Sequence, residues 1–133
     1  MTSILDINLD DVPDLTIVDT DEYELSLCGV EIKTSKKGEP YINAVFDIMG
    51  EPNAQKIYHI VMLPSDSCDE DTLIRRKRQM KKFYTALGIP LSGQEVDLED
   101  YIGTTVSAFV GVQEGDSEYP ESKNNIRRFI LPA

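Results

Sequence analysis

The sequence has few of the residues that build disulfide or metal sites. It contains two cysteines, Cys28 and Cys68, and one histidine, His59. Two cysteines are too few for a disulfide framework, and with a single histidine they make no metal-ligand spacing. We therefore expect two reduced thiols in or near the core, a structural role for His59 in an apolar strand, and no metal or other cofactor.

Catalytic signatures are missing as well. The sequence contains no G-x-S-x-G, no phosphate-binding glycine loop, no H-E-x-x-H and no zinc cysteine pattern. Asp and Glu are abundant, but they gather in turns and near the N-terminus, where solubility explains them better than acid–base catalysis or Mg²⁺ binding. We therefore predict that the protein is not an enzyme.

Long apolar runs are also absent. The longest, such as residues 60–64, have about five residues, against about 18 for a membrane-spanning helix. The N-terminal residues lack the basic stretch and the apolar stretch of a signal peptide. These absences predict a protein with no membrane partner that stays in the cytoplasm.

Lysine and arginine do not occur in residues 1–24, which hold eight acidic residues: Asp6, Asp10, Asp11, Asp14, Asp19, Asp21, Glu22 and Glu24. The chain has 24 acidic and 13 basic residues, so residues 25–133 hold 16 acids against 13 bases and are close to neutral. The net charge of −11 therefore reflects an acidic N-terminal block. It does not exclude a nucleic-acid partner, because phosphates are bound by local basic clusters.

With 133 residues and 41% hydrophobic content, the chain is long enough for one domain around one core. Residues 1–14 are polar and acidic and include Pro13, so we expect a flexible acidic arm there and a single domain over residues 15–133.

Residues 15–34 are predicted to form a bent first strand. Its apolar positions change phase at Gly29, falling first at Tyr23, Leu25 and Leu27, then at Val30 and Ile32. A strand that changes its buried face at a glycine contains a bulge and a bend.

Four further strands are predicted by alternation or apolar character. Residues 41–49 place Ile42, Ala44, Phe46 and Ile48 on the core face, and residues 56–63 form a third strand whose facing the pattern leaves open. Residues 104–113 place Val106, Ala108, Val110 and Val112 inward and Thr105, Ser107, Phe109 and Gly111 outward. Residues 124–131 form the last strand, with Arg127 and Arg128 on opposite sides.

Between the third and fourth strands the pattern predicts a long helix. Ser67 and Glu70 match a capping box, and the helix is expected to end near Leu87, before Gly88 and Pro90. Its apolar stripe is Leu73, Met80, Phe83, Tyr84 and Leu87. A short helical turn is expected over residues 98–102, with Asp97 as its N-cap.

This order, three strands, one helix and two strands, predicts an all-β fold with one major helix. It is the connectivity of the five-stranded oligonucleotide-binding, or OB, barrel with a bent first strand. The helix would then plug the open bottom of the barrel. OB barrels bind nucleic acids, sugars and other proteins, so the fold alone does not select the ligand.

Two kinds of residue favour a single-stranded nucleic acid. Tyr41 and Phe109 are expected on the outer surface, where rings can stack on unpaired bases, and Tyr58 is a third candidate. The alternative is that these rings cover a barrel end or pack under a loop. Lys33, Lys36 and Lys37 lie in or before a turn at Gly38 and could contact phosphates beside the binding face, although a solvated turn explains them equally well.

The six basic residues between positions 75 and 82 surround the predicted helix, which favours a solvated surface over a binding stripe, with a partner protein or the acidic arm as other candidates. Arg127 and Arg128, beside Phe129, are better nucleic-acid candidates because they lie on a strand.

Four segments carry a family resemblance: S-K-K-G-E-P-Y-I-N-A-V-F-D-I at 35–48, L-G-I after the basic helix, D-L-E-D-Y-I-G-T-T-V at 97–106, and N-N-I-R-R-F-I at 124–130. They resemble bacteriophage-encoded single-stranded DNA-binding proteins of the OB type. The resemblance implies a non-catalytic, metal-free protein that coats single-stranded DNA in phage replication or recombination, in the host bacterial cytoplasm. By position it implies DNA contacts from Lys36, Lys37, Tyr41, Phe109, Arg127 and Phe129.

Many members of that family end in an acidic tail that recruits phage or host replication proteins, whereas this chain carries its acid at the front. Either the block of residues 1–24 takes that role, or recruitment is absent or runs through another surface. We also expect this block to compete with DNA for the basic groove. Two other functions stay open: an acidic interaction module or DNA mimic that binds a host replication or repair factor, and a recombination mediator or nuclease accessory. Oligomeric state and a preference between DNA and RNA leave no mark in the sequence.

Overall fold

The computed structural model describes residues 3–93, 95–118 and 120–131. Its elements follow in the predicted order: β1 (Asp21–Thr34), β2 (Pro40–Ile48), β3 (Ile57–Met62), α1 (Glu70–Leu87), the 3-10 helix η1 (Leu98–Tyr101), β4 (Thr105–Gln113) and β5 (Lys123–Ile130). In the described part of the chain, no helix is long and apolar enough to cross a membrane.

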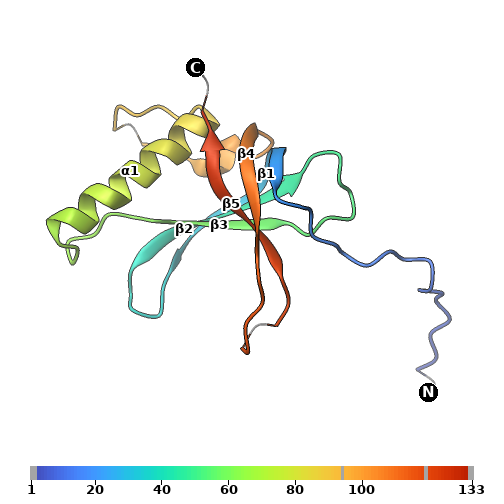
Figure 1. Cartoon of the computed structure of the whole chain (residues 1–133). Helices are drawn as coiled ribbons and strands as arrows, with labels where there is room; N and C mark the ends of the chain where they lie inside the picture. Colours follow the sequence, from blue (N-terminus) through green and yellow to red (C-terminus); the bar gives the residue numbers. More distant parts are fainter. Residues whose placement is uncertain (1–2, 94, 119, 132–133) are drawn as a thin grey trace.

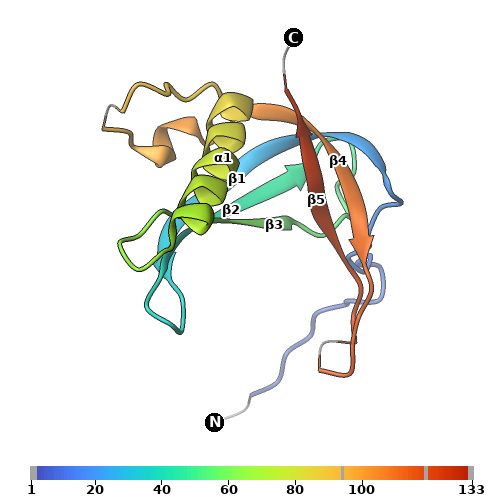
Figure 2. The ribbon, with the colours of Figure 1, turned by 60° about the vertical axis from the view of Figure 1, so that its left-hand side comes forward.

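The five strands form one antiparallel sheet in the order β3-β2-β1-β4-β5 (Figures 1 and 2). β1 lies at the centre and pairs with β4 along its first half and with β2 along its second. Among the described residues no hydrogen-bonded ladder joins the edge strands β3 and β5, so hydrogen bonds do not close the sheet. The mostly-β fold with one helix is confirmed.

β1 bends at a bulge. Leu27 pairs with Phe46 and Gly29 pairs with Val45, so Cys28 is the additional residue. This confirms the change of register predicted beside Gly29. The bend lets one strand serve as the centre of the sheet with both β2 and β4 as neighbours.

β1 begins at Asp21, so its predicted start at residue 15 is wrong. The preceding segment contacts the body at isolated points instead of extending β1: Thr16 forms a single parallel bridge with Ala54, and the backbone of Val18 bonds to the side chain of Asn124. These contacts hold residues 16–18 against the segment that enters β3 and against the start of β5. Residues 3–15 extend away from the body (Figure 1).

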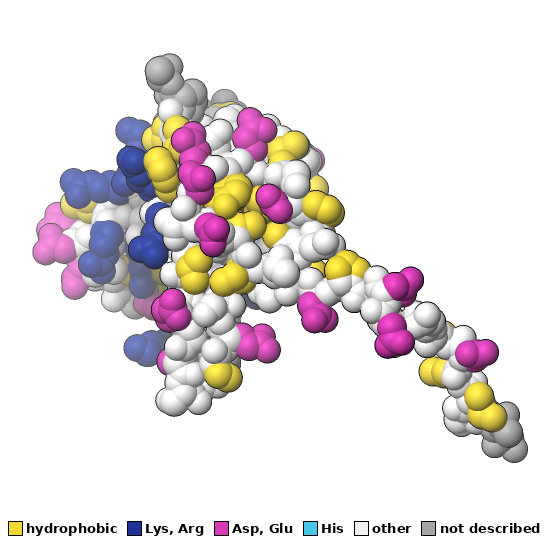
Figure 3. Space-filling view, turned by 45° about the vertical axis from the view of Figure 1, so that its right-hand side comes forward, with side chains coloured by type: hydrophobic (Ala, Val, Ile, Leu, Met, Phe, Trp, Pro, Cys, Tyr) yellow, Lys and Arg dark blue, Asp and Glu magenta, His cyan; other side chains and the backbone are white. Residues whose placement is uncertain are grey.

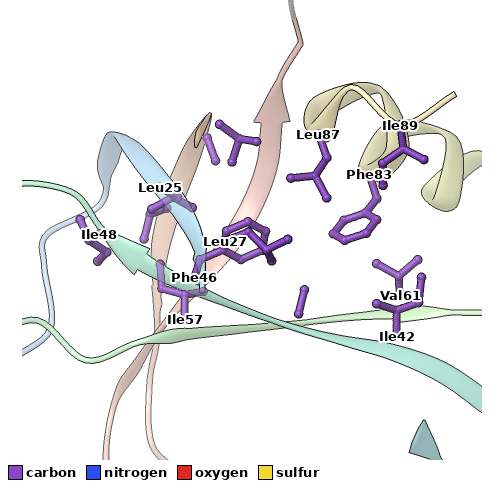
Figure 4. Close-up of a cluster of buried hydrophobic side chains, with 14 residues drawn as sticks. Leu25, Leu27, Ile42, Phe46, Ile48, Ile57, Val61, Phe83, Leu87 and Ile89 are labelled. Carbon is purple, nitrogen blue, oxygen red and sulfur yellow. The ribbon is translucent and has the colours of Figure 1, made fainter. Parts of the chain in front are cut away.

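The core lies on the inner face of the sheet, under α1 (Figure 4). The predicted core face of β2 is confirmed, because its members Ile42, Ala44, Phe46 and Ile48 are all buried. From α1, Phe83 and Leu87 are buried against these strands. Each fully buried side chain of this size contributes about 1.5 to 3 kcal/mol.

The cap of α1 differs from the prediction. Asp69, not Ser67, is the N-cap, and its carboxylate accepts a hydrogen bond of 2.7 Å from the Thr72 N–H, which lowers the pKa of Asp69. The Ser67 hydroxyl instead pairs with the Ser65 hydroxyl at 2.9 Å. At the other end, Gly88 ends the helix in the left-handed conformation, as predicted. The predicted N-cap of η1, Asp97, is confirmed by its bond from the Glu99 N–H.

A second bulge lies between β4 and β5. Phe109 pairs with Arg128 and Val110 pairs with Ile126, so Arg127 is the additional residue on β5. Gly111, expected outward, is buried, and Val112, expected inward, is half-buried. The side chain of Arg127 covers Gly111, because a Cβ built on Gly111 would lie 1.9 Å from the Arg127 Nε.

Candidate nucleic-acid interface

The outer face of β1, β2 and β3 carries several of the predicted binding residues. The strand register places Lys33 of β1 beside Tyr41 of β2, and Val45 of β2 beside Tyr58 of β3. The open question about β3 is settled, because Ile57 and Val61 are buried whereas Tyr58 is 62% exposed. Tyr41 is half-buried, so only part of its ring is available to a ligand.

Lys33 is charged and lies near both rings. Its ammonium forms a 3.0 Å ion pair with Glu31, which raises the pKa of Lys33, and Tyr41 and Tyr58 raise it further. The ion pair is exposed, so it adds little to stability, and the lysine can exchange Glu31 for a phosphate.

Two hollows meet at Tyr58. One, of about 410 Å³, lies over β1, β2 and β3, and the other, of about 610 Å³, lies between β3 and the β4–β5 loop. We call the surface formed by these two hollows the β3 trough. Its loop side carries Glu114 and Glu121 as well as Lys123, so the trough has no uniform positive charge.

The loop between β1 and β2 holds Lys36 and Lys37, both exposed. Its turn is closed by the bond from the Gly38 N–H to the Ser35 carbonyl, with Gly38 at φ 83°. Beside the turn, Glu39 forms a 3.2 Å ion pair with Arg76 of α1, whose guanidinium also donates to the Leu63 carbonyl. Arg76 therefore connects α1 to this loop, so the solvated surface expected for the basic residues of the helix does not apply to Arg76.

Phe109 and Arg127 lie on β4 and β5, away from the β3 trough lining. The Arg128 guanidinium lies 4.4 Å from the centre of the Phe109 ring, which covers one face of that ring. Arg127 and Arg128 were predicted on opposite sides, and this is wrong: the bulge at Arg127 directs both toward the outer face of β4, one over Gly111 and one over Phe109.

Phe129 faces the core. Its ring centre lies 6.2 Å from that of Phe46, 5.2 Å from His59 and 6.2 Å from Phe83. The ring therefore supports the inner face of β5, and it does not form an outer stacking platform. His59 belongs to the same aromatic cluster, and burial lowers the pKa of its imidazole.

A third hollow, of about 370 Å³, lies between α1, β3 and β5, and we call it the seam groove. Its described lining includes three basic residues, Lys82, Arg127 and Arg128, and no acidic residue, and the guanidinium groups of the two arginines lie toward the outer face of β4. Sequence patterns did not predict this groove, because Lys82 lies 45 and 46 residues before the two arginines and only the packing of α1 brings them to one groove.

In the described residues, no group of three His, Cys, Asp or Glu side chains could hold a metal ion. A scan against protein-family models finds no match for the sequence, and a search of curated proteins finds none either.

Proposed function

We propose that the protein is a non-catalytic single-stranded DNA-binding protein that acts in phage DNA replication or recombination. The observation that carries the proposal is the set Lys33, Tyr41 and Tyr58, which comes from three neighbouring strands of one sheet. Lys33 and Tyr58 line the same hollow, and Tyr41 is the strand neighbour of Lys33. A lysine beside partly exposed rings provides a phosphate contact and stacking contacts on the same surface.

We also propose that the fold is an OB barrel that is open between β3 and β5. The strand order β3-β2-β1-β4-β5, the bulge in β1 and the position of α1 between β3 and β4 in the chain support this assignment. β3 and β5 line the same seam groove, so the two edges of the sheet approach one another. In OB folds the middle strands and the flanking loops form the ligand face, which corresponds here to the β3 trough.

A single strand of DNA would cross the β3 trough with its bases against Tyr58 and Tyr41 and its phosphates toward Lys33, Lys36 and Lys37. Stacking contributes about 1 to 3 kcal/mol per base and does not depend on sequence. A duplex keeps its bases stacked on each other and gains only the phosphate contacts. The lysine–phosphate contacts release counterions, so binding should be strongest at low salt. The acidic residues on the loop side repel phosphates and make this salt dependence shallower.

The test is the affinity of labelled oligo-dT for wild type, two Tyr58 variants and a double variant of Lys36 and Lys37. Tyr58→Ala should weaken binding about 5- to 150-fold, the equivalent of one lost stacked base, whereas Tyr58→Phe keeps the ring and should bind like wild type. Replacing Lys36 and Lys37 with alanine should reduce the slope of log affinity against log salt by about 1.4. Equal affinities for all three Tyr58 proteins would contradict the proposed face.

One observation favours a second function, an acidic module that occupies a DNA-binding site on a host replication or repair factor. Eight acids and no basic residue lie in residues 1–24, and the arm that carries four of them is exposed. Under this alternative the protein would not bind oligo-dT at any salt concentration and would displace DNA from such a factor.

A further inference from the structure

The arm formed by residues 3–15 exposes an unusual amount of apolar surface. Six large apolar side chains are 59 to 84% exposed: Ile4, Leu5, Ile7, Leu9, Val12 and Leu15. Single exposed apolar residues are ordinary, but so many in one short segment are typical of an interaction site. The structure thus leaves this segment without a packing surface.

The arm is also amphipathic. Leu5, Ile7 and Leu9 alternate with Asp6, Asn8 and Asp10, so an extended chain presents apolar side chains on one side and polar ones on the other. The same segment contains no lysine or arginine. A surface that fits the arm must therefore combine an apolar floor with basic side chains at its rim.

The seam groove has that combination. Ile60, Phe129 and Leu131 supply apolar surface, and Ile60 and Leu131 are 57% and 40% exposed. Three basic residues, Lys82, Arg127 and Arg128, are among its described lining residues, and none of those residues is acidic. The described lining of the groove thus contains basic residues and no acidic ones, whereas the arm contains acidic residues and no basic ones.

We propose that the arm of one copy docks in the seam groove of a second copy. Its leucine and isoleucine side chains contact the apolar floor, and its aspartates face Lys82, Arg127 and Arg128. This inference does not rest on the proposed DNA binding.

The position of the arm favours a second copy over its own groove. The contacts of Thr16 and Val18 fix its root, and from there it leads away from the body, with the visible lysines and arginines gathered on the other side of the molecule (Figure 3). Thirteen extended residues reach about 45 Å, enough to cross to a neighbour. Because arm and groove are different surfaces, the contact is head-to-tail and can link copies into an open chain.

Charge exchange tests the proposal with the full-length protein. One variant replaces Asp6, Asp10, Asp11 and Asp14 with lysine, and the other replaces Lys82, Arg127 and Arg128 with glutamate. Sedimentation velocity over a concentration series, without DNA, measures the association. Wild type should associate as concentration rises, and each variant alone should associate at least about tenfold more weakly. An equimolar mixture of the two variants should associate about as strongly as wild type, because each arm then meets a groove of opposite charge.

The matched control replaces Lys36, Lys37 and Arg78 with glutamate, which makes the same charge change outside the groove. It should associate like wild type. A wild-type protein that stays monomeric at all concentrations would overturn the proposal, as would docking within one chain, which gives no concentration dependence. Equal weakening by the control, or no recovery in the mixture, would also overturn it.

Discussion

Asn124 should be the most sensitive polar residue of the structure. Its side chain is buried at 5% exposure and makes three hydrogen bonds: Oδ1 accepts from the Val18 N–H at 2.8 Å, and Nδ2 donates to the carbonyls of Val18 at 2.9 Å and Gly111 at 3.1 Å. These bonds join the segment before β1 to β4 and β5. Each contributes about 0.5 to 1.5 kcal/mol, and the loss of Asn124 leaves partly buried backbone groups without partners.

Asn124→Ala should therefore lower the free energy of unfolding by about 2 to 4 kcal/mol in urea denaturation, a large part of the 5 to 15 kcal/mol typical of a domain. Asn125→Ala is the matched control, because the buried Oδ1 of Asn125 has no hydrogen-bond partner among the described residues. It should cost less than about 1 kcal/mol. Equal losses for the two variants would refute the role assigned to Asn124.

Three further predictions test the packing and the caps. Phe129→Ala should lower the free energy of unfolding by about 3 to 5 kcal/mol and Phe109→Ala by much less, because only Phe129 packs in the core aromatic cluster. The midpoints of urea denaturation compare the two variants, and a larger loss for Phe109→Ala would contradict the facing of β5. In thermal unfolding, Asp69→Ala should lower the free energy of unfolding by about 1 kcal/mol and Ser67→Ala by less than half of that. Similar losses for the two variants would contradict Asp69 as the N-cap of α1. Burial lowers the pKa of His59 in the folded state, so as the pH falls the unfolded state takes up a proton first, near pH 6.5. The free energy of unfolding should therefore decrease between about pH 7 and pH 5.5. His59→Phe should reduce this decrease, and an unchanged decrease in the variant would contradict the burial of His59.

The strong local signals of the sequence predicted much of the fold. Strict alternation gave the inner face of β2, the phase change beside Gly29 gave the bulge in β1, and Gly88 gave the end of α1. Each of these features is decided by a few neighbouring residues, so a pattern in one segment is sufficient to find it.

Features that depend on distant partners were missed. The bulge at Arg127 has no glycine to mark it on β5, because the space for its side chain is provided by Gly111 on the neighbouring strand. The facing of β3 is set by α1 and β5, which cover the side of His59 and leave Tyr58 outside. The cap of α1 was misassigned because Ser67 and Asp69 both suit that role and only the chain path selects one of them.

The most direct test of the central claim is fluorescence anisotropy of a labelled oligo-dT strand of about 30 nucleotides and of a matched duplex, titrated with the full-length protein at low and moderate salt. We predict saturable binding to the single strand that weakens as salt rises, and much weaker binding to the duplex. Failure to bind the single strand at low salt, or equal affinity for the two DNA forms, would contradict the assignment of this protein to single-stranded DNA.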